Sequence, residues 1–84
     1  MTEKDRLKSK KTIDTIGLFC PVPLFRTRES LDSDDLKVGE ILEVLADDPA
    51  AESDLKSFAK RTGHEIIEIE KEDDILRFLI KKSR

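Results

Sequence analysis

Apolar positions recur with two different periods along this 84-residue chain, and they predict six secondary-structure elements. A period of about two residues is typical of a strand with one buried face, and a period near 3.6 is typical of an amphipathic helix. The pattern predicts strands at 11–16 and 40–46, helices at 22–33 and 50–62, and strands at 65–70 and 74–80.

The order of these elements, β-α-β-α-β-β, predicts the fold class. Two strands that are each followed by a helix favour right-handed crossovers onto a common sheet, and the last two strands favour a hairpin with its turn at 71–73. Both helices should then cover one face, which gives an α/β (α+β) two-layer sandwich. The other face is expected to be open and partly apolar, with these residues: Ile41, Leu45, Ile66, Ile75 and Leu79.

The two predicted helices differ in the clarity of their signals. The helix at 50–62 has a regular apolar stripe, Asp48 and Pro49 at its start, and Gly63 at its end. The helix at 22–33 has a weaker stripe formed by Leu24, Thr27 and Leu31. Phe25 lies in its first turn, and we interpret it as an ordinary core residue.

Length and composition restrict the classes of protein. We expect residues 1–10 to form a flexible polar tail and residues 11–84 to form a single domain. Charged residues make up 42% of the chain, with 16 basic and 19 acidic side chains interspersed, so no clustered basic excess favours direct nucleic-acid binding. No apolar run is long enough for a membrane span, and no signal peptide is recognisable. One cysteine permits no intramolecular disulfide, so we expect a cytoplasmic protein.

That cysteine, Cys20, is the main candidate for chemistry. Pro21 favours an extended conformation at Cys20, and Pro23 is tolerated only in the first turn of a helix. The thiol is therefore expected at a helix N-terminus, where the macrodipole stabilises anions and favours a thiolate nucleophile. A lone cysteine can equally be a small buried apolar residue, and the residues alone leave both interpretations open.

Other polar residues have structural interpretations. His64 could serve as a base for Cys20, but its position after a helix-ending glycine favours a surface or capping role. Asp47 and Asp48 are interpreted as turn and capping residues, because further metal ligands are absent from their surroundings in the sequence. The acidic segment Asp32–Asp35 should end the first helix. We predict no metal and no cofactor.

With these elements placed, the chain resembles the TusA/SirA-like sulfur carrier family. The motif D-x-x-G-x-x-C-P-x-P is present in full, and the residues that match it are Asp14, Gly17, Cys20, Pro21 and Pro23. Residues 39–40, 47–50, 54–55 and 63–64 also follow the family's order, so the resemblance covers about residues 11–82. The chain departs from the family in one segment. The stretch between Cys20 and Gly39 is about two residues longer than in well-known members, and it contains the acidic segment Asp32–Asp35.

The resemblance implies a mixed four-stranded sheet and a persulfide-forming Cys20. Sulfur would come from a cysteine desulfurase or a rhodanese-type donor and pass to a downstream acceptor protein, in tRNA thiolation, molybdenum-cofactor supply or sulfur metabolism. The protein would be a carrier that acts with partner sulfurtransferases rather than an independent enzyme, as a monomer or weak dimer. Arg26 or Arg28 could guide acidic partner surfaces. The alternative is a non-catalytic RNA- or protein-binding regulatory module that uses the open sheet face.

Overall fold

The computed structural model describes residues 9–19 and 21–83, and these residues form four strands and two helices. All six predicted elements are present. In chain order they are β1 (Lys11–Asp14), α2 (Val22–Leu31), β2 (Ile41–Ala46), α3 (Ala50–Thr62), β3 (Glu65–Glu72) and β4 (Ile75–Lys81). The expected tail overlaps the described residues only at Ser9 and Lys10, and the Lys10 N–H donates to the Ile41 carbonyl at 2.8 Å.

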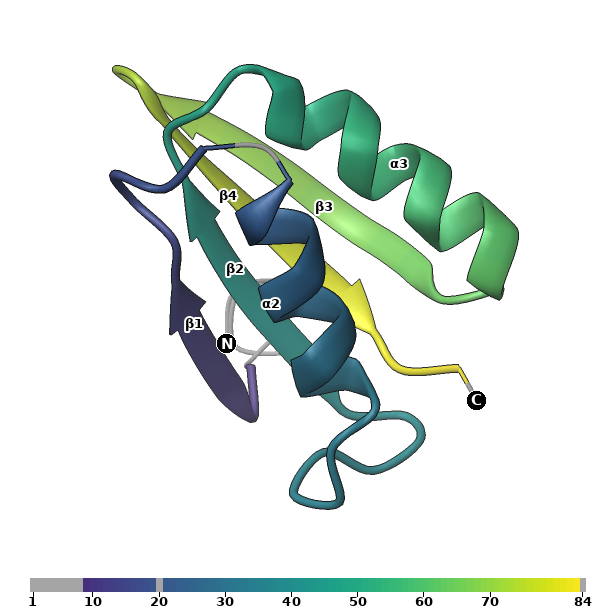
Figure 1. Cartoon of the computed structure of the whole chain (residues 1–84). Helices are drawn as coiled ribbons and strands as arrows, with labels where there is room; N and C mark the ends of the chain where they lie inside the picture. The colour runs from purple at the N-terminus through teal and green to yellow at the C-terminus, as the bar shows by residue number, and fades with distance from the viewer. Residues whose placement is uncertain (1–8, 20, 84) are drawn as a thin grey trace.

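The four strands form one mixed sheet in the order β1-β2-β4-β3. β1 pairs with β2 in parallel, and β4 lies antiparallel to both β2 and β3. Both helices cover the same face of this sheet, as Figure 1 shows. The predicted α+β two-layer sandwich is therefore confirmed. Neither helix in the described part of the chain is long and apolar enough to cross a membrane.

The core lies between the sheet and the helices. Leu42, Val44 and Ala46 of β2 are fully buried, which confirms the alternation predicted for this strand. α3 begins and ends where the sequence predicts, and its stripe is buried as expected. The Gly63 backbone has φ +86°, a left-handed conformation that glycine adopts without strain, so it ends the helix. The remaining members of the core cluster are Leu31, Leu36, Ala51, Leu55, Phe58, Leu76, Phe78 and Ile80.

Several boundaries differ from the prediction: β1 ends at Asp14 rather than at residue 16, and the bounds of β2 and β4 differ by one residue. α2 ends at Leu31 rather than at residue 33, because Asp32 already acts as its C-cap and donates its N–H to the Arg28 carbonyl at 3.0 Å. The β3–β4 turn lies at Asp73 and Asp74 rather than at 71–73. Asp73 has φ +55°, which is the only positive φ among the described non-glycine residues.

The sheet faces that the sequence predicts for the β3 side chains were partly wrong. Ile66 was placed on the open face, but it packs against the core cluster together with Ile69. The cause is a register shift between Ile66 and Glu68, where Ile67 has no direct partner on β4. A bulge of this kind inserts one extra residue and reverses the alternation beyond it.

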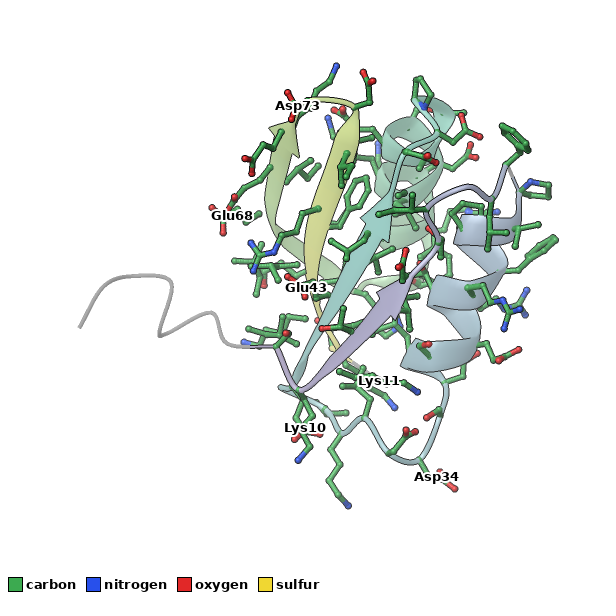
Figure 2. The ribbon with its side chains drawn as sticks, turned by 90° about the vertical axis from the view of Figure 1, so that its left-hand side faces the viewer. Lys10, Lys11, Asp34, Glu43, Glu68 and Asp73 are labelled. Carbon is green, nitrogen blue, oxygen red and sulfur yellow. The ribbon has the colours of Figure 1, made fainter. Side chains whose placement is uncertain are left out.

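The open sheet face carries an ion-pair network centred on Arg77 of β4. Its guanidinium donates to Glu43 of β2 and, at 3.1 Å, to Glu70 of β3, while Thr12 of β1 donates to Glu43 at 2.8 Å. Partial burial raises the pKa of Glu43, but the hydrogen bonds from Arg77 and Thr12 outweigh this effect and lower it below its ordinary value. Figure 2 shows Glu43, together with Glu68, on the side of the sheet opposite the helices.

Candidate functional site

The loop at 15–19, between β1 and α2, precedes the C-P-x-P motif and is fixed to the end of β2. Thr15 is buried, and both its N–H and its hydroxyl donate to the Leu45 carbonyl, at 2.8 and 2.6 Å. The Leu18 N–H then donates to the Thr15 carbonyl at 3.0 Å, which closes a turn. The chain therefore leaves the sheet in a defined direction.

Asp14 and Gly17, two residues of the sequence motif, shape the same loop. The Asp14 carboxylate accepts a hydrogen bond from the Ile16 N–H at 2.9 Å, an arrangement that stabilises a turn. Gly17 has φ +86° and donates its N–H to the Asp47 carboxylate at 3.0 Å. A residue with a Cβ is strained at this φ, which explains the glycine physically. Asp47, which we had interpreted only as a turn residue, is thus part of the site's framework.

Pro23 has the position that the sequence predicts, whereas the conformation that Pro21 was expected to favour at Cys20 lies outside the described residues. Pro21 is the N-cap residue of α2, and Pro23 lies in the first turn, where it is fully buried. The Val22 N–H donates to the Phe19 carbonyl at 2.9 Å. The helix therefore begins at Val22, two residues after Cys20 in the sequence.

Cys20 itself lies outside the described residues. The side chains around it in the sequence are exposed and apolar: Phe19 is 76% exposed, Phe25 is 57% exposed and Val22 is 36% exposed. Phe25 is therefore not a core residue, and that interpretation was wrong. It lies one position from Leu24, which packs on the core, and one residue corresponds to a rotation of about 100° around a helix.

Phe19, Val22 and Phe25 form a set of apolar side chains that we call the apolar patch. The three side chains are close in the sequence, at the start of α2, and exposed apolar side chains that adjoin one another mark interaction sites. The sequence signal for the patch was available, because Phe25 lies outside the stripe of Leu24, Thr27 and Leu31.

Arg26 and Arg28 are both exposed and lie on different sides of α2. Arg28 lines a groove between α2 and α3, together with Phe25 and Arg61. Arg26 lines a separate pocket beside β1, together with Asp14 and Glu29. Two residues apart on a helix correspond to a rotation of about 200°, which accounts for the separation.

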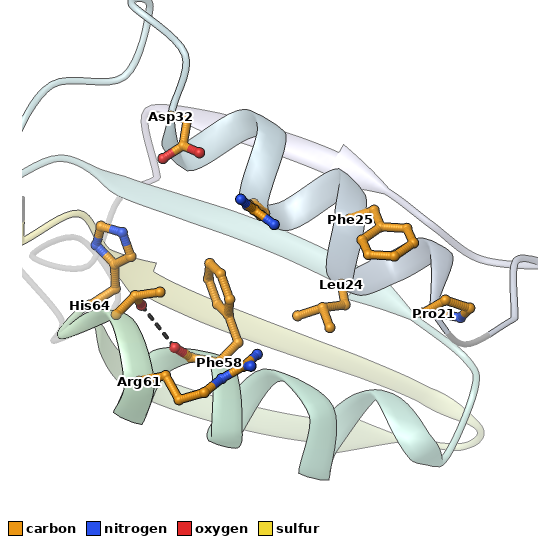
Figure 3. Close-up of a pocket in the computed structure, with 9 residues that line it drawn as sticks. Pro21, Leu24, Phe25, Asp32, Phe58, Arg61 and His64 are labelled. Carbon is orange, nitrogen blue, oxygen red and sulfur yellow. Dashed lines mark hydrogen bonds between the residues drawn. The ribbon is translucent and has the colours of Figure 1, made fainter.

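His64 is buried, so the surface role in the expected surface or capping assignment was wrong. It is 9% exposed, its Nδ1 accepts a hydrogen bond from the Ser83 N–H at 3.1 Å, and its ring centroid lies 6.1 Å from that of Phe58. In Figure 3, His64 and Pro21 lie at opposite ends of the groove. The structure therefore does not bring His64 to the start of α2, where a base for Cys20 would act.

The acidic residues named from the sequence have structural partners. Asp48 accepts a hydrogen bond from the Ala50 N–H at 3.0 Å just before α3, whose N-cap residue is Pro49, so Asp48 acts as a turn residue. Asp35 pairs with Lys11 at 3.1 Å, and this hydrogen bond lowers the pKa of Asp35. Among the residues that the structure describes, no group of three His, Cys, Asp or Glu side chains could hold a metal ion.

Comparisons with known proteins agree with this architecture. The chain superposes on the crystal structure of a SirA-like protein from Desulfitobacterium hafniense with a TM-score of 0.75 and 27% identity, over 88% of this chain and 99% of that one. The fold and the loop before α2 thus define a SirA-like α+β domain.

Sequence comparisons identify the family. Residues 11–82 match the family described as Sulfurtransferase TusA. A protein from Archaeoglobus fulgidus with the provisional name of sulfur carrier protein is 53% identical over 84% of this chain and 91% of its own length. The sulfur carrier protein TusA of Allochromatium vinosum is 41% identical over 84% of this chain and 91% of its own length. The chain belongs to the TusA family.

Proposed function

We propose that this protein is a sulfur carrier in which Cys20 accepts a sulfane sulfur as a persulfide and passes it to a partner protein. The observation that carries the proposal is the apolar patch of Phe19, Val22 and Phe25 around the position of Cys20 in the sequence. A thiol that exchanges sulfur with other proteins must be reachable by them, and exposed apolar side chains next to it supply a contact surface.

The transfer step conserves atoms and electrons. The Cys20 thiolate attacks the outer sulfur of a persulfide on a donor cysteine, a new S–S bond forms on Cys20, and the donor cysteine leaves as a thiolate. The reverse arrangement delivers the sulfur to an acceptor thiol. The N-terminal end of α2 favours both the Cys20 thiolate and the terminal persulfide anion, because the partial positive charge of the helix lies there.

The absence of a second cysteine supports a carrier role over a self-contained thiol enzyme. Cys20 is the only cysteine in the chain, so no second thiol of the same chain can attack its persulfide. The sulfur is then held until a partner's thiol arrives, in a reducing compartment such as the cytoplasm. The sulfur donor is a cysteine desulfurase or a rhodanese-type protein, and a downstream acceptor protein receives the sulfur. Arg26 or Arg28 guides the acidic surfaces of these partners.

The alternative function, RNA or protein binding through the open sheet face, has less support. That face carries Glu43, Glu68 and Glu70 around Arg77, and these carboxylates disfavour a phosphate backbone. The apolar patch lies instead at the start of α2.

Intact-mass measurement tests the proposal. Reduced protein is incubated with inorganic polysulfide, or with a cysteine desulfurase and cysteine. A gain of about 32 Da, one sulfur atom, that maps to Cys20 and is removed by reductant supports a persulfide carrier. The gain must be absent in Cys20→Ser. A folded protein whose thiol is alkylated but gains no sulfur from either source contradicts the proposal.

A further inference from the structure

The open sheet face has an excess of carboxylates at its centre. Arg77 of β4 lies there and already bonds to Glu43 and Glu70. Glu68 of β3 is a further carboxylate that interacts electrostatically with Arg77, and within the described residues Glu68 has no ion-pair partner. Three carboxylates therefore share one guanidinium, and the centre of this face carries negative charge that is not neutralised.

The strand register separates Glu68 from the cations of this face. Glu68 and Glu43 both lie directly opposite Leu79, so an apolar side chain stands between the two carboxylates in this row. Glu65, at the start of β3, instead lies opposite Lys81 on β4. A charge of opposite sign on the neighbouring strand offsets that of Glu65, whereas Glu68 has no such neighbour on β4. Glu68 is therefore the carboxylate with most to gain from an added cation.

A pocket of about 320 Å³ extends the same surface toward the β3–β4 turn. Its lining adds the carboxylates of Glu72 and Asp73 and the apolar side chains of Leu45 and Ile75. Ile75 is 39% exposed. The open sheet face thus combines negative charge with uncovered apolar area along its length, as a surface that receives a basic and partly apolar segment would.

Residues 1–8, which lie outside the described part of the chain, have that composition. Residues 6–8 read Arg-Leu-Lys, so an apolar side chain stands between two cations. The acidic residues of the segment, Glu3 and Asp5, come earlier and lie further from the sheet along the chain. The part of the segment that is nearest to β1 is therefore the part whose charge is opposite to that of the open sheet face.

The position of Lys10 brings this segment to the edge of that face. The Lys10 N–H donates to the carbonyl of half-buried Ile41 at 2.8 Å. An extended chain advances about 3.4 Å per residue, and neighbouring strands lie about 4.8 Å apart. Leu7, three residues before Lys10, can therefore reach about 10 Å, which is also about the distance from β1 across β2 to β4. Arg6, one residue earlier and with a long side chain, can reach β3.

We infer that residues 1–8 fold back over the open sheet face of their own chain, with Leu7 on Ile41 and the cations on either side of Leu7 at Glu68. The segment supplies the positive charge that Arg77 alone does not, and it covers apolar area that other chains could contact. Because the segment is tethered beside the face, its effective concentration there is on the order of millimolar, so a contact too weak for a separate peptide forms within the chain. The inference goes beyond the proposed function and uses none of its chemistry.

Nuclear Overhauser contacts in the full chain test the inference. At low ionic strength, wild type should show contacts between the methyl groups of Leu7 and Ile41. Arg6→Glu/Lys8→Glu should lower the ratio of docked to undocked segment about fivefold, and these contacts should weaken in proportion. Added salt should weaken them in wild type as well, because the charges are exposed.

A charge-swap cycle identifies the partner on the sheet. Glu68→Lys should cause the same loss, and its combination with Arg6→Glu/Lys8→Glu should restore contacts, because the charges attract one another again. Glu29→Lys is the matched control: it changes the net charge equally, but exposed Glu29 belongs to α2 on the covered side of the sheet. It should leave the contacts unchanged. Circular dichroism melts confirm that each variant is folded.

Every other outcome overturns the inference. Folded wild type without contacts between Leu7 and Ile41 does so, and so does a Glu68→Lys effect no larger than that of Glu29→Lys. A combined variant that restores no contacts removes Glu68 as the partner. Contacts that appear only between an isotope-labelled and an unlabelled chain assign the face to the segment of a second copy instead. None of these results involves Cys20, so the proposed function is tested separately.

Discussion

Asp47 at the end of β2 accepts a hydrogen bond from the backbone N–H of Gly17, 30 residues earlier in the chain, at 3.0 Å. Gly17 lies in the loop that leads to Cys20. The bond joins the carboxyl end of β2 to that loop, next to the point where Thr15 bonds to Leu45. The conformation of the segment before the cysteine therefore depends on a side chain from another strand.

The first prediction concerns this anchor. Asp47→Ala removes the acceptor and should lower the free energy of unfolding by about 1 kcal/mol, whereas Asp47→Asn keeps an acceptor oxygen and should restore most of it. Iodoacetamide should alkylate Cys20 more slowly in Asp47→Ala than in Asp47→Asn. The asparagine side chain can still accept the hydrogen bond from Gly17 that holds the loop, whereas alanine cannot. Urea denaturation and alkylation rates at neutral pH measure the two effects.

Asp48→Ala is the matched control for that comparison. It removes the same charge from the next residue, but the Asp48 carboxylate bonds to Ala50 at the start of α3 and not to Gly17. We expect a similar loss of stability and an unchanged alkylation rate. If both alanine variants change the alkylation rate equally, charge rather than the Gly17 bond is responsible.

The second prediction contrasts two phenylalanines that line the same groove, between α2 and α3. Phe25 is 57% exposed and Phe58 is 4% exposed. Phe25→Ala should change the free energy of unfolding by less than about 0.5 kcal/mol, whereas Phe58→Ala should lower it by about 3 kcal/mol or more. Phe25→Ala should nevertheless slow sulfur loading from a desulfurase while leaving polysulfide loading unchanged.

Thermal and urea unfolding, measured beside the two loading assays, check this contrast. A large loss of stability in Phe25→Ala would show that Phe25 is buried in solution. Unchanged desulfurase loading in a stable Phe25→Ala protein would remove Phe25 from the contact surface.

The third prediction concerns pH and the open sheet face. The pKa of Glu43 is lowered from 4.5 in the folded protein, because bonds from Arg77 and Thr12 outweigh the effect of burial. Its stabilising contribution is therefore complete above the unfolded-state pKa and is lost as the pH falls through the folded-state value. Glu43→Gln should cost about 1 kcal/mol at pH 7.

This difference should shrink as the pH falls and Glu43 takes up a proton in wild type. Urea denaturation near pH 7 and near pH 3 measures it. Glu65→Gln, on exposed Glu65 of β3, is the control and should show little change at either pH. A constant difference between wild type and Glu43→Gln at both values would contradict the assigned role of the charge.

The sequence predicted the architecture because local patterns determine it. The alternation of Leu42, Val44 and Ala46 gives β2, and the apolar stripe ending near Gly63 gives α3. The element order then limits the topology to a few arrangements, of which the two-layer sandwich was the correct one. Among the motif residues, Asp14, Pro21 and Pro23 likewise act within a few residues of themselves.

The features that were missed depend on distant partners. The burial of His64 involves Ser83, 19 residues later, and the role of Asp47 involves Gly17 on another segment. The inward direction of Ile66 depends on a bulge against β4, which no pattern within β3 reveals. Phe25 was assigned to the core from its residue type, although its helical position pointed outward.

The last prediction concerns the β3–β4 turn. Asp73 has φ +55°, a left-handed conformation that costs most residues about 1 kcal/mol, and acidic Glu72 and Asp74 flank it. Asp73→Gly removes the conformational strain, and Asp73→Asn keeps a residue that tolerates this φ while removing one of the adjacent like charges. Each should raise the free energy of unfolding by about 0.5 kcal/mol, as urea denaturation can measure. Asp73→Val, a β-branched residue that is strained at positive φ, should lower it instead. An increase with valine would show that the turn adopts another conformation in solution.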